Sequence, residues 1–290
     1  MHRSQHLVPL TLILLAGCPT TSSDEVDPTR WLDVAANGRI LVAPDGRAWS
    51  FSLDSTVPPE QLPGGDFVEA VGITARFGLT STGELILWDE TEPDRPLPSG
   101  VRPPIHASGI LCAVLDDRLS CWKCIQQPTL CGEWMGEYTD YSIQPEISGL
   151  TPDGELVDVR TNEVLATPGP GTRLAVSGDN TCWFDEDRHP VCLGEDKYGV
   201  LDAPDSQLLS LAIGWGFAIG VEPDGSLISW GCEDPNGKGE VSPGLCRVPD
   251  GVGYQRVWAE AASACAEVED GSVTCWGGSL GRDFPAPNEL

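Results

Sequence analysis

The chain has few basic residues, few histidines and no long apolar segment outside its N-terminus. It holds 17 Lys and Arg against 44 Asp and Glu, which gives a formal net charge of −27 over 290 residues. An acidic surface of this kind repels phosphate backbones, so nucleic acid is a poor partner. No second apolar run approaches the ~18 residues that a membrane-spanning helix needs.

Histidine is scarce enough to exclude several kinds of active site. Two of the four histidines, His2 and His6, lie in the N-terminal segment, which leaves only His106 and His189. Histidine-based triads and His-rich metal sites are therefore excluded. Neither a Gly-x-Ser-x-Gly motif nor a phosphate-cradling loop is present. We predict no catalytic residue, no metal site and no cofactor, and expect a protein that is not an enzyme.

Two acidic loops, Asp185–Asp187 and Glu233–Glu240, offer oxygen ligands of the kind that calcium prefers. The second loop carries Lys238 and lacks the closing glutamate of an EF-hand. Turn formation explains both loops without a metal, so no calcium site is predicted.

The N-terminus has the pattern of an export signal. Arg3 precedes an apolar run from Leu7 to Ala16, which ends at Leu15-Ala-Gly-Cys18. This tetrapeptide resembles the bacterial lipobox, which implies that Cys18 is lipid-modified. We predict a signal peptide over residues 1–17, a flexible tether over 18–29 and a lipid-anchored protein of the cell envelope, on the outer membrane and facing the periplasm or the surface. A plain cleaved signal is the alternative.

Abundant turn residues and an internal repeat define the rest of the chain. The 33 Gly and 25 Pro favour many short strands, while a 40% hydrophobic composition with 10 Trp suffices for a core. Seven copies of one pattern place a bulky residue five positions after a turn, often Asp-Gly, at intervals of 34 to 46 residues. These bulky residues are Phe51, Trp88, Trp122, Val159, Leu193, Trp230 and Trp276.

Each copy predicts a hairpin whose Asp-Gly turn supplies positive φ. A strand-like segment precedes each hairpin, and an outer strand would complete a four-stranded sheet. Seven such sheets close into a ring. We therefore expect residues 30–290 to form one all-β domain, a seven-bladed β-propeller of four-stranded antiparallel sheets that is monomeric.

The segment from Gly214 to Gly231, GWGFAIGVEPDGSLISWG, resembles the repeat of the regulator-of-chromosome-condensation family. Cys192-Leu-Gly194, followed by Lys197-Tyr-Gly-Val-Leu201, is similar to the trailing part of that repeat. The resemblance covers roughly residues 30–280 and implies a seven-bladed β-propeller. It implies little about function, because relatives include a nucleotide-exchange factor, a plant light receptor and a secreted β-lactamase inhibitor.

Ten cysteines remain beside Cys18, and all have a local partner. We predict five disulfides, as expected for an exported protein; they join Cys112 to Cys121, Cys124 to Cys131, Cys182 to Cys192, Cys232 to Cys246 and Cys265 to Cys275. The alternatives are a zinc site formed by the four cysteines between residues 112 and 131, and a redox pair at Cys121-Trp-Lys-Cys124.

Aromatic residues in two places are candidates for binding. Trp134, Tyr138 and Tyr141 lie in an otherwise polar segment, and Trp215 and Phe217 follow a glycine. In both places packing into the fold is the alternative. The functional prediction is a lipid-anchored module that binds a protein or an envelope ligand. The alternatives are an inhibitor of a secreted enzyme, as the resemblance permits, and a carboxylate-dependent hydrolase.

Overall fold

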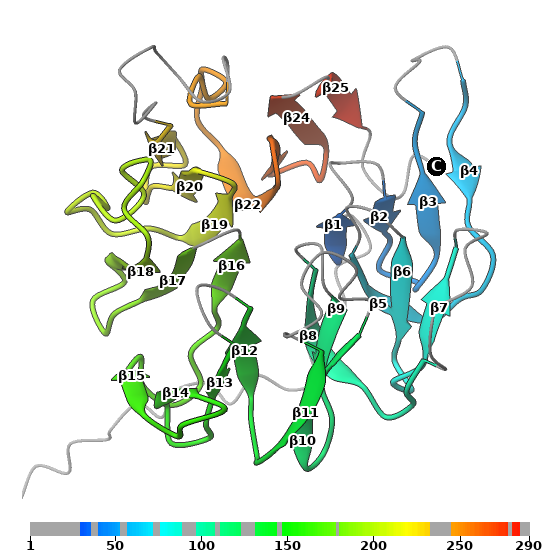
Figure 1. The fold of residues 1–290 in the computed structure, drawn as a ribbon. Coiled ribbons are helices and arrows are strands. Elements are labelled where there is room, and N and C mark those ends of the chain that lie inside the picture. Colours follow the sequence, from blue (N-terminus) through cyan, green and yellow to red (C-terminus); the bar gives the residue numbers. More distant parts are fainter. Residues whose placement is uncertain are drawn as a thin grey trace, which may run out of the picture.

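The computed structural model describes residues 30–35, 40–52, 57–71, 76–88, 97–107, 111–122, 131–143, 147–177, 180–232, 245–277 and 280–284. Within these ranges every regular element is a β-strand, and no helix is present. The strands form seven separate antiparallel sheets, each built from successive strands (Figure 1). We number them sheet 1 to sheet 7 in chain order.

Four sheets have four strands. Sheet 1 contains β1 (Asp33–Ala35), β2 (Ile40–Val42), β3 (Ala48–Ser50) and β4 (Glu60–Gln61). Sheet 3 contains β8 (Arg102–Ala107), β9 (Leu111–Val114), β10 (Arg118–Trp122) and β11 (Gly132–Met135). Sheet 4 contains β12 (Asp140–Ser142), β13 (Ser148–Leu150), β14 (Leu156–Asp158) and β15 (Val164–Ala166). Sheet 7 contains β22 (Tyr254–Glu260), β23 (Ser263–Val268), β24 (Val273–Gly277) and β25 (Leu280–Phe284).

The other three sheets have three strands in the described ranges. Sheet 2 contains β5 (Phe67–Val71), β6 (Phe77–Thr80) and β7 (Leu85–Leu87). Sheet 5 contains β16 (Ala175–Ser177), β17 (Asn180–Phe184) and β18 (Pro190–Gly194), and sheet 6 contains β19 (Ser210–Gly214), β20 (Phe217–Val221) and β21 (Leu227–Gly231).

The prediction of four strands in every sheet is wrong for sheet 5. After β18 the chain forms no strand before β19, and instead Tyr198 and Val200 are buried between sheets 5 and 6. The segments that follow β7 and β21 lie outside the described residues.

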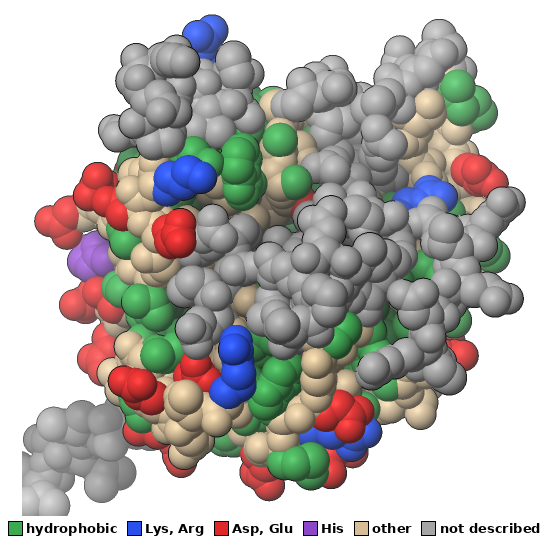
Figure 2. Space-filling model, viewed as in Figure 1, with side chains coloured by type: hydrophobic (Ala, Val, Ile, Leu, Met, Phe, Trp, Pro, Cys, Tyr) green, Lys and Arg blue, Asp and Glu red, His purple; other side chains and the backbone are tan. Residues whose placement is uncertain are grey.

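The first strand of each sheet lies toward the middle of the molecule, and the later strands lie farther out (Figure 1). First strands of neighbouring sheets contact one another at most steps along the chain, and β22 also contacts β1. The last sheet thus lies beside the first. Acidic side chains are spread around the periphery, with few basic ones among them (Figure 2).

A hydrogen bond of one kind joins each sheet to the next along the chain. A backbone N–H at or before the first strand of one sheet donates to a carbonyl in the hairpin turn of the sheet before it. The six bonds of this kind, which we call joints, run from Phe67 to Gly46 (2.9 Å), Val101 to Gly83 (3.0 Å), Gly136 to Asp117 (2.9 Å), Gly169 to Gly154 (3.0 Å), Leu208 to Arg188 (3.0 Å) and Tyr254 to Gly225 (3.0 Å).

The joints explain why glycine recurs in the turns. Gly154 has a φ of +83°, and a Cβ there would lie 1.9 Å from the carbonyl carbon of Gly169. Glycine therefore meets two demands at once, a left-handed backbone and the close approach of the next sheet. Two turns depart from this rule: Arg188 occupies the position in sheet 5 with a φ of +65°, and Asp117 occupies it in sheet 3 without a positive φ.

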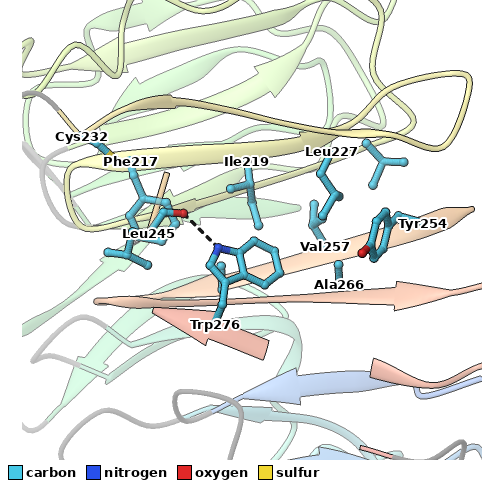
Figure 3. Packing of buried hydrophobic residues seen from close by; sticks show 11 residues of the cluster. Phe217, Ile219, Leu227, Cys232, Leu245, Tyr254, Val257, Ala266 and Trp276 are labelled. Atoms are coloured by element: carbon cyan, nitrogen blue, oxygen red, sulfur yellow. Dashed lines mark hydrogen bonds between the residues drawn. The ribbon is translucent and has the colours of Figure 1, made fainter. Parts of the chain in front are cut away.

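The core fills the spaces between adjacent sheets. Between sheets 6 and 7, Phe217 and Ile219 from β20 face Trp276 from β24 (Figure 3). The Trp276 indole N–H donates to the Leu245 carbonyl at 2.9 Å, so this large apolar ring is buried without an orphaned donor. Trp230 makes the same bond to the carbonyl of Val200 at 2.9 Å. The bulky residue of the repeat is thus a packing residue.

Sheets 1 and 7 meet through side chains. The fully buried Glu267 carboxylate accepts the Trp31 N–H at 3.1 Å. It also accepts two bonds from the Arg256 guanidinium, both at 2.9 Å, and that guanidinium in turn donates to the Trp31 carbonyl. An apolar cluster that includes Trp31, Val34 and Cys265 lies beside this group. We call the contact between the two sheets the seam.

Candidate functional site

A groove of about 990 Å³ opens along sheet 5. Its walls come from the segment that leads into β16, from the hairpin between β17 and β18, and from the start of β19. Trp183 lines it and is buried, whereas Val191 and Leu209 are 37% and 46% exposed. The groove thus presents apolar side chains to solvent.

Exposed apolar side chains line this groove and also occupy the strand that precedes one of its walls. Val164 and Leu165 of β15 are 48% and 41% exposed, and their strand leads directly into the wall segment that starts at Thr167. With Val191 and Leu209 they make four of the eight large exposed apolar residues in the described part of the chain. A concentration of this kind is typical of an interaction surface, whereas single exposed apolar residues are ordinary.

Two of the chain's few cations line the groove. Arg188 is fixed by its bonds to the carbonyls of Leu208 (2.9 Å) and Leu209 (2.6 Å), and its guanidinium lies 4.6 Å from the centre of the Phe184 ring. Arg173 is exposed at the opposite wall. Asp185 and Glu186 of the β17–β18 hairpin also line the groove, so it combines apolar surface with charges of both signs.

A second, smaller cavity of about 240 Å³ lies among the first strands and receives Asp33 and Glu69. Their carboxylates bind the backbone of the next sheet. Asp33 accepts the Ala70 N–H at 2.9 Å, and Glu69 accepts the Ile105 N–H at 3.1 Å with both oxygens. The buried Asp140 carboxylate binds Leu174 N–H in the same way at 2.9 Å. These acids hold adjacent sheets together.

Confinement in this cavity changes the proton affinity of the two acids. Burial raises the pKa of Asp33, although bonds from the backbone and the charge of Arg256 oppose the shift. Burial raises the pKa of Glu69 well above its ordinary value, and the nearby charge of Asp33 adds to the effect. The pair thus favours the protonated state more than surface carboxylates do.

The structure corrects the prediction of an exposed aromatic patch at residues 134–141. Tyr141 is fully buried, and its hydroxyl donates to the Cys112 carbonyl and accepts the His106 N–H at 2.6 Å. Tyr138 is buried in the same core, and Trp134 on β11 is half-buried against it. Short strands place these residues between sheets 3 and 4, so the alternative of packing into the fold applies.

Of the second group of aromatic candidates, one residue is exposed and the other is buried. Trp215 is 44% exposed and packs edge-on against Tyr198, with ring centres 5.2 Å apart. Phe217 is fully buried in the core between sheets 6 and 7, so it cannot contact a partner directly. Only Trp215 remains available as a surface residue.

Four of the predicted disulfides are confirmed: Cys112–Cys121, Cys182–Cys192, Cys232–Cys246 and Cys265–Cys275. Cys131 is also in a disulfide, and its predicted partner Cys124 lies outside the described residues, as does Cys18. Because Cys121 is bonded to Cys112, the zinc and redox alternatives do not apply.

The two histidines outside the N-terminal segment each contact a carboxylate. The His106 ring lies 3.1 Å from Asp140, and His189 lies in a turn, where its backbone N–H donates to Asp185 at 2.8 Å. Among the described residues no group of three or more His, Cys, Asp or Glu is placed to hold a metal ion. The loop at residues 233–240 falls outside them. The described residues also include no helix long and apolar enough to cross a membrane.

Comparison with solved structures identifies the architecture. The chain is similar to the CRINKLY WD40 ectodomain of the Arabidopsis thaliana receptor kinase ACR4, with a TM-score of 0.59 and 15% identity over 88% of this chain and 97% of the other. It is also similar to the ectodomain of the Physcomitrella patens receptor kinase CR4, with a TM-score of 0.55 and 15% identity over 85% of this chain and 72% of the other. The fold is a β-propeller. No family model and no curated protein matches the chain.

Sequence reasoning missed the groove of this propeller. One signal was available, because the fifth copy reads Asp187-Arg-His where four of the other copies have Asp-Gly. An arginine in place of the turn glycine indicates that its side chain has a role at this turn, and Arg188 does line the groove. The missing fourth strand beside it left no pattern in the sequence.

Proposed function

We propose that this protein is an exported, lipid-anchored, seven-bladed β-propeller that binds a partner protein or an envelope ligand at its surface. The seven successive sheets, with the last beside the first, support seven blades in a ring. The four disulfides are typical of proteins in an extracellular or periplasmic space, which supports export. The lipid anchor rests on the lipobox pattern at Cys18.

The observation that carries the binding function is the groove along sheet 5. Its exposed apolar residues are Val191 and Leu209. Val191 lies on the β17–β18 hairpin, which the Cys182–Cys192 disulfide cross-links. Because the scaffold is already rigid, binding there loses little conformational entropy. Rigid concave surfaces with apolar side chains and a few charged groups are the usual basis of recognition.

Metabolic labelling with radioactive palmitate in a bacterial host tests the anchor. We expect the wild-type chain to incorporate label and fractionate with membranes, and the Cys18→Ser variant to do neither. A Cys131→Ser variant is the control, and it should keep the label. Equal labelling of the wild type and Cys18→Ser would contradict the lipid anchor.

Affinity capture with the exported protein tests the binding function. We expect the immobilised protein to retain a specific component of envelope extracts that a variant with a blocked groove, Leu209→Asp, does not retain. Leu209 is exposed, so this substitution should leave the fold intact. If wild type and variant retain the same components, or neither retains any, the groove is not the binding surface of this protein.

The contacts of two carboxylates argue against the hydrolase alternative. The carboxylates that approach the central cavity, Asp33 and Glu69, are each occupied by backbone N–H groups of the next sheet. A structural role accounts for their positions. Loss of folding, rather than loss of turnover in a folded protein, is therefore the expected result of replacing both.

A further inference from the structure

Sheet 5 ends at an open edge. Its outermost strand, β18, pairs with β17 and with no other strand, although residues 180–232 are described without a gap. No strand lies outside β18 at the rim of the molecule (Figure 1). An edge strand of this kind presents unpaired backbone groups. β18 has no Lys that would discourage pairing, and its one proline, Pro190, is the first residue of the strand and precedes the positions that matter below.

The register fixes which backbone groups face outward. The Asp185 N–H donates to the His189 carbonyl at 3.0 Å, which makes Asp185–His189 a hydrogen-bonded pair. Hydrogen-bonded and non-hydrogen-bonded pairs alternate along antiparallel strands, so Cys182–Cys192 is a non-hydrogen-bonded pair. The Cα–Cα distance of 4.1 Å agrees with that assignment. The N–H and C=O groups of Cys192 and Gly194 therefore point away from β17.

Two other sheets show what this position normally receives. Cys121 in sheet 3 and Cys275 in sheet 7 are the second cysteines of equivalent disulfide hairpins. A fourth strand pairs with each of them, at Gly132 and at Arg282 respectively. In sheet 5 the equivalent residue, Cys192, has no such partner strand among the described residues. The scaffold thus has the geometry for a fourth strand there and no strand to fill it.

The groove lies on the matching face of this sheet. Trp183 and Val191 are directly opposite each other on β17 and β18, so their side chains share one face, and both line the groove. A residue added opposite Val191 would project its side chain over the same face. A strand at the open edge would therefore place alternate side chains in the groove.

We propose that sheet 5 binds an extended segment of a partner protein as its fourth strand, antiparallel to β18. The segment carries apolar side chains at alternate positions, which enter the groove, and an acidic side chain that pairs with Arg173. Backbone bonds to Cys192 and Gly194 hold the segment, as in other cases of strand addition. This inference rests on the proposed binding function and names the partner's chemistry.

Charge favours this occupant over a second copy of the chain. Two copies would each bring a net charge of −27 to the contact, and like charges oppose association. Within the groove Arg173 is exposed and can pair with an acidic side chain, whereas Arg188 is held by the carbonyls of Leu208 and Leu209. Asp185 and Glu186 add negative charge on the hairpin side, so the segment needs only one acid, placed at Arg173. A short segment that is mostly apolar brings that acid without a large net charge.

Selection from a phage-displayed hexapeptide library tests the proposal, with the exported protein as the target. We expect enriched peptides to alternate apolar residues and to contain Asp or Glu. A chosen peptide should lose at least tenfold in affinity for Val191→Lys and severalfold for Arg173→Gln. Val252→Lys, which places the same charge at a 69% exposed position outside the groove, should bind like wild type.

A change on the peptide keeps the test independent of protein folding. Methylation of the amide that donates to the Cys192 carbonyl should abolish binding, whereas methylation of the next amide should not, because only alternate amides face β18. No enrichment, equal binding to Val191→Lys, or tolerance of both methylations would overturn the proposal. So would concentration-dependent dimerisation that Val191→Lys abolishes. If Val191→Lys captures the same envelope component as wild type, the binding function stands, but the edge of sheet 5 is not the binding site.

Discussion

The six joints along the chain and the seam between sheets 1 and 7 hold neighbouring sheets together by different chemistry. Each joint uses one backbone hydrogen bond between segments that are close in sequence, from 15 residues apart at Gly154 and Gly169 to 29 at Gly225 and Tyr254. The seam uses charged side chains and connects Trp31 to Glu267, 236 residues away.

The difference follows from connectivity. At a joint the covalent chain already keeps the two sheets near each other, so the backbone bond, apolar packing and, at some steps, one carboxylate such as Asp33 bound to a backbone N–H are enough. At the seam no covalent link exists, and closing a long loop costs more entropy. Sheet 1 is built from N-terminal strands alone and sheet 7 from C-terminal strands alone, so no shared strand closes the seam in the described part of the chain. The group of Arg256, Glu267 and Trp31 supplies the attachment instead.

Removing the seam carboxylate should have the largest effect. Glu267→Ala removes both carboxylate bonds of the Arg256 guanidinium and the carboxylate bond of the Trp31 N–H. We expect the free energy of unfolding to fall by about 3–4 kcal/mol, toward the low end of the cost of breaking a buried ion pair on one side, because the Arg256 side chain is 35% exposed. Urea denaturation measures it.

A double-mutant cycle separates the seam from general effects of losing an acid. Arg256→Ala combined with Glu267→Ala should cost clearly less than the sum of the single variants, because the two side chains interact. Glu155→Ala, at an exposed acid, should stay within about 0.5 kcal/mol of wild type. A loss at Glu267 no larger than at Glu155 would show that the seam does not depend on this group.

A joint should be nearly as sensitive to an added methyl group. Gly154→Ala forces a Cβ to within 1.9 Å of the Gly169 backbone, so the joint must open. Gly171→Ala is the matched control, because its φ of +77° is similar to the +83° of Gly154 but nothing lies within 4 Å of its Cβ. We expect about 3 kcal/mol of destabilisation for Gly154→Ala and about 1 kcal/mol for Gly171→Ala. Equal losses would mean that backbone conformation alone requires the glycine.

The joints and the seam differ in how far they could be predicted from the sequence. The Asp-Gly turns and the cysteine spacings are local patterns, and the turn glycines and four of the five predicted disulfides agree with them. Glu267 gave no signal, because a contact across 236 residues has no local period and the chain holds many acids. Tyr141 was misjudged since the three-residue strand β12 is buried throughout, so no alternation marks its inner face.

Two disulfides of equal span compare the seam with the chain interior directly. Cys182–Cys192 and Cys265–Cys275 both have a sequence separation of 10 and a Cα–Cα distance of 4.1 Å, so their effects on the unfolded chain are alike. Cys265 and Cys275 pack in the seam cluster with Trp31, whereas Cys182 packs between sheets 5 and 6. Replacing either pair by alanines should cost about 2–3 kcal/mol by thermal or urea unfolding. If replacing Cys265–Cys275 costs more than replacing Cys182–Cys192, the difference in the free energy of unfolding measures the packing of the seam. If the two losses are equal, the ion pair alone stabilises the seam.

The smallest expected effect is a gain. Glu69 links sheets 2 and 3 through the Ile105 N–H, yet its raised pKa means that the folded state prefers it protonated. The stability from this preference is fully present below the unfolded-state pKa and is lost as pH rises through the folded one. Glu69→Gln keeps an oxygen for the Ile105 N–H and removes the charge. We therefore expect a Tm at pH 7 about 2–4 °C above wild type and a weaker rise in stability on acidification.

A turn acid should behave in the opposite way. The pKa of Asp270 is lowered because its carboxylate accepts bonds from the Ser272 hydroxyl and N–H, so its contribution exists above the unfolded-state pKa and is lost as pH falls through the folded one. Asp270→Asn should thus lower the Tm at pH 7, where Glu69→Gln raises it. If Glu69→Gln lowers the Tm as Asp270→Asn does, the charge of Glu69 does not oppose folding, and the carboxylates between sheets stabilise the fold in their ionised form.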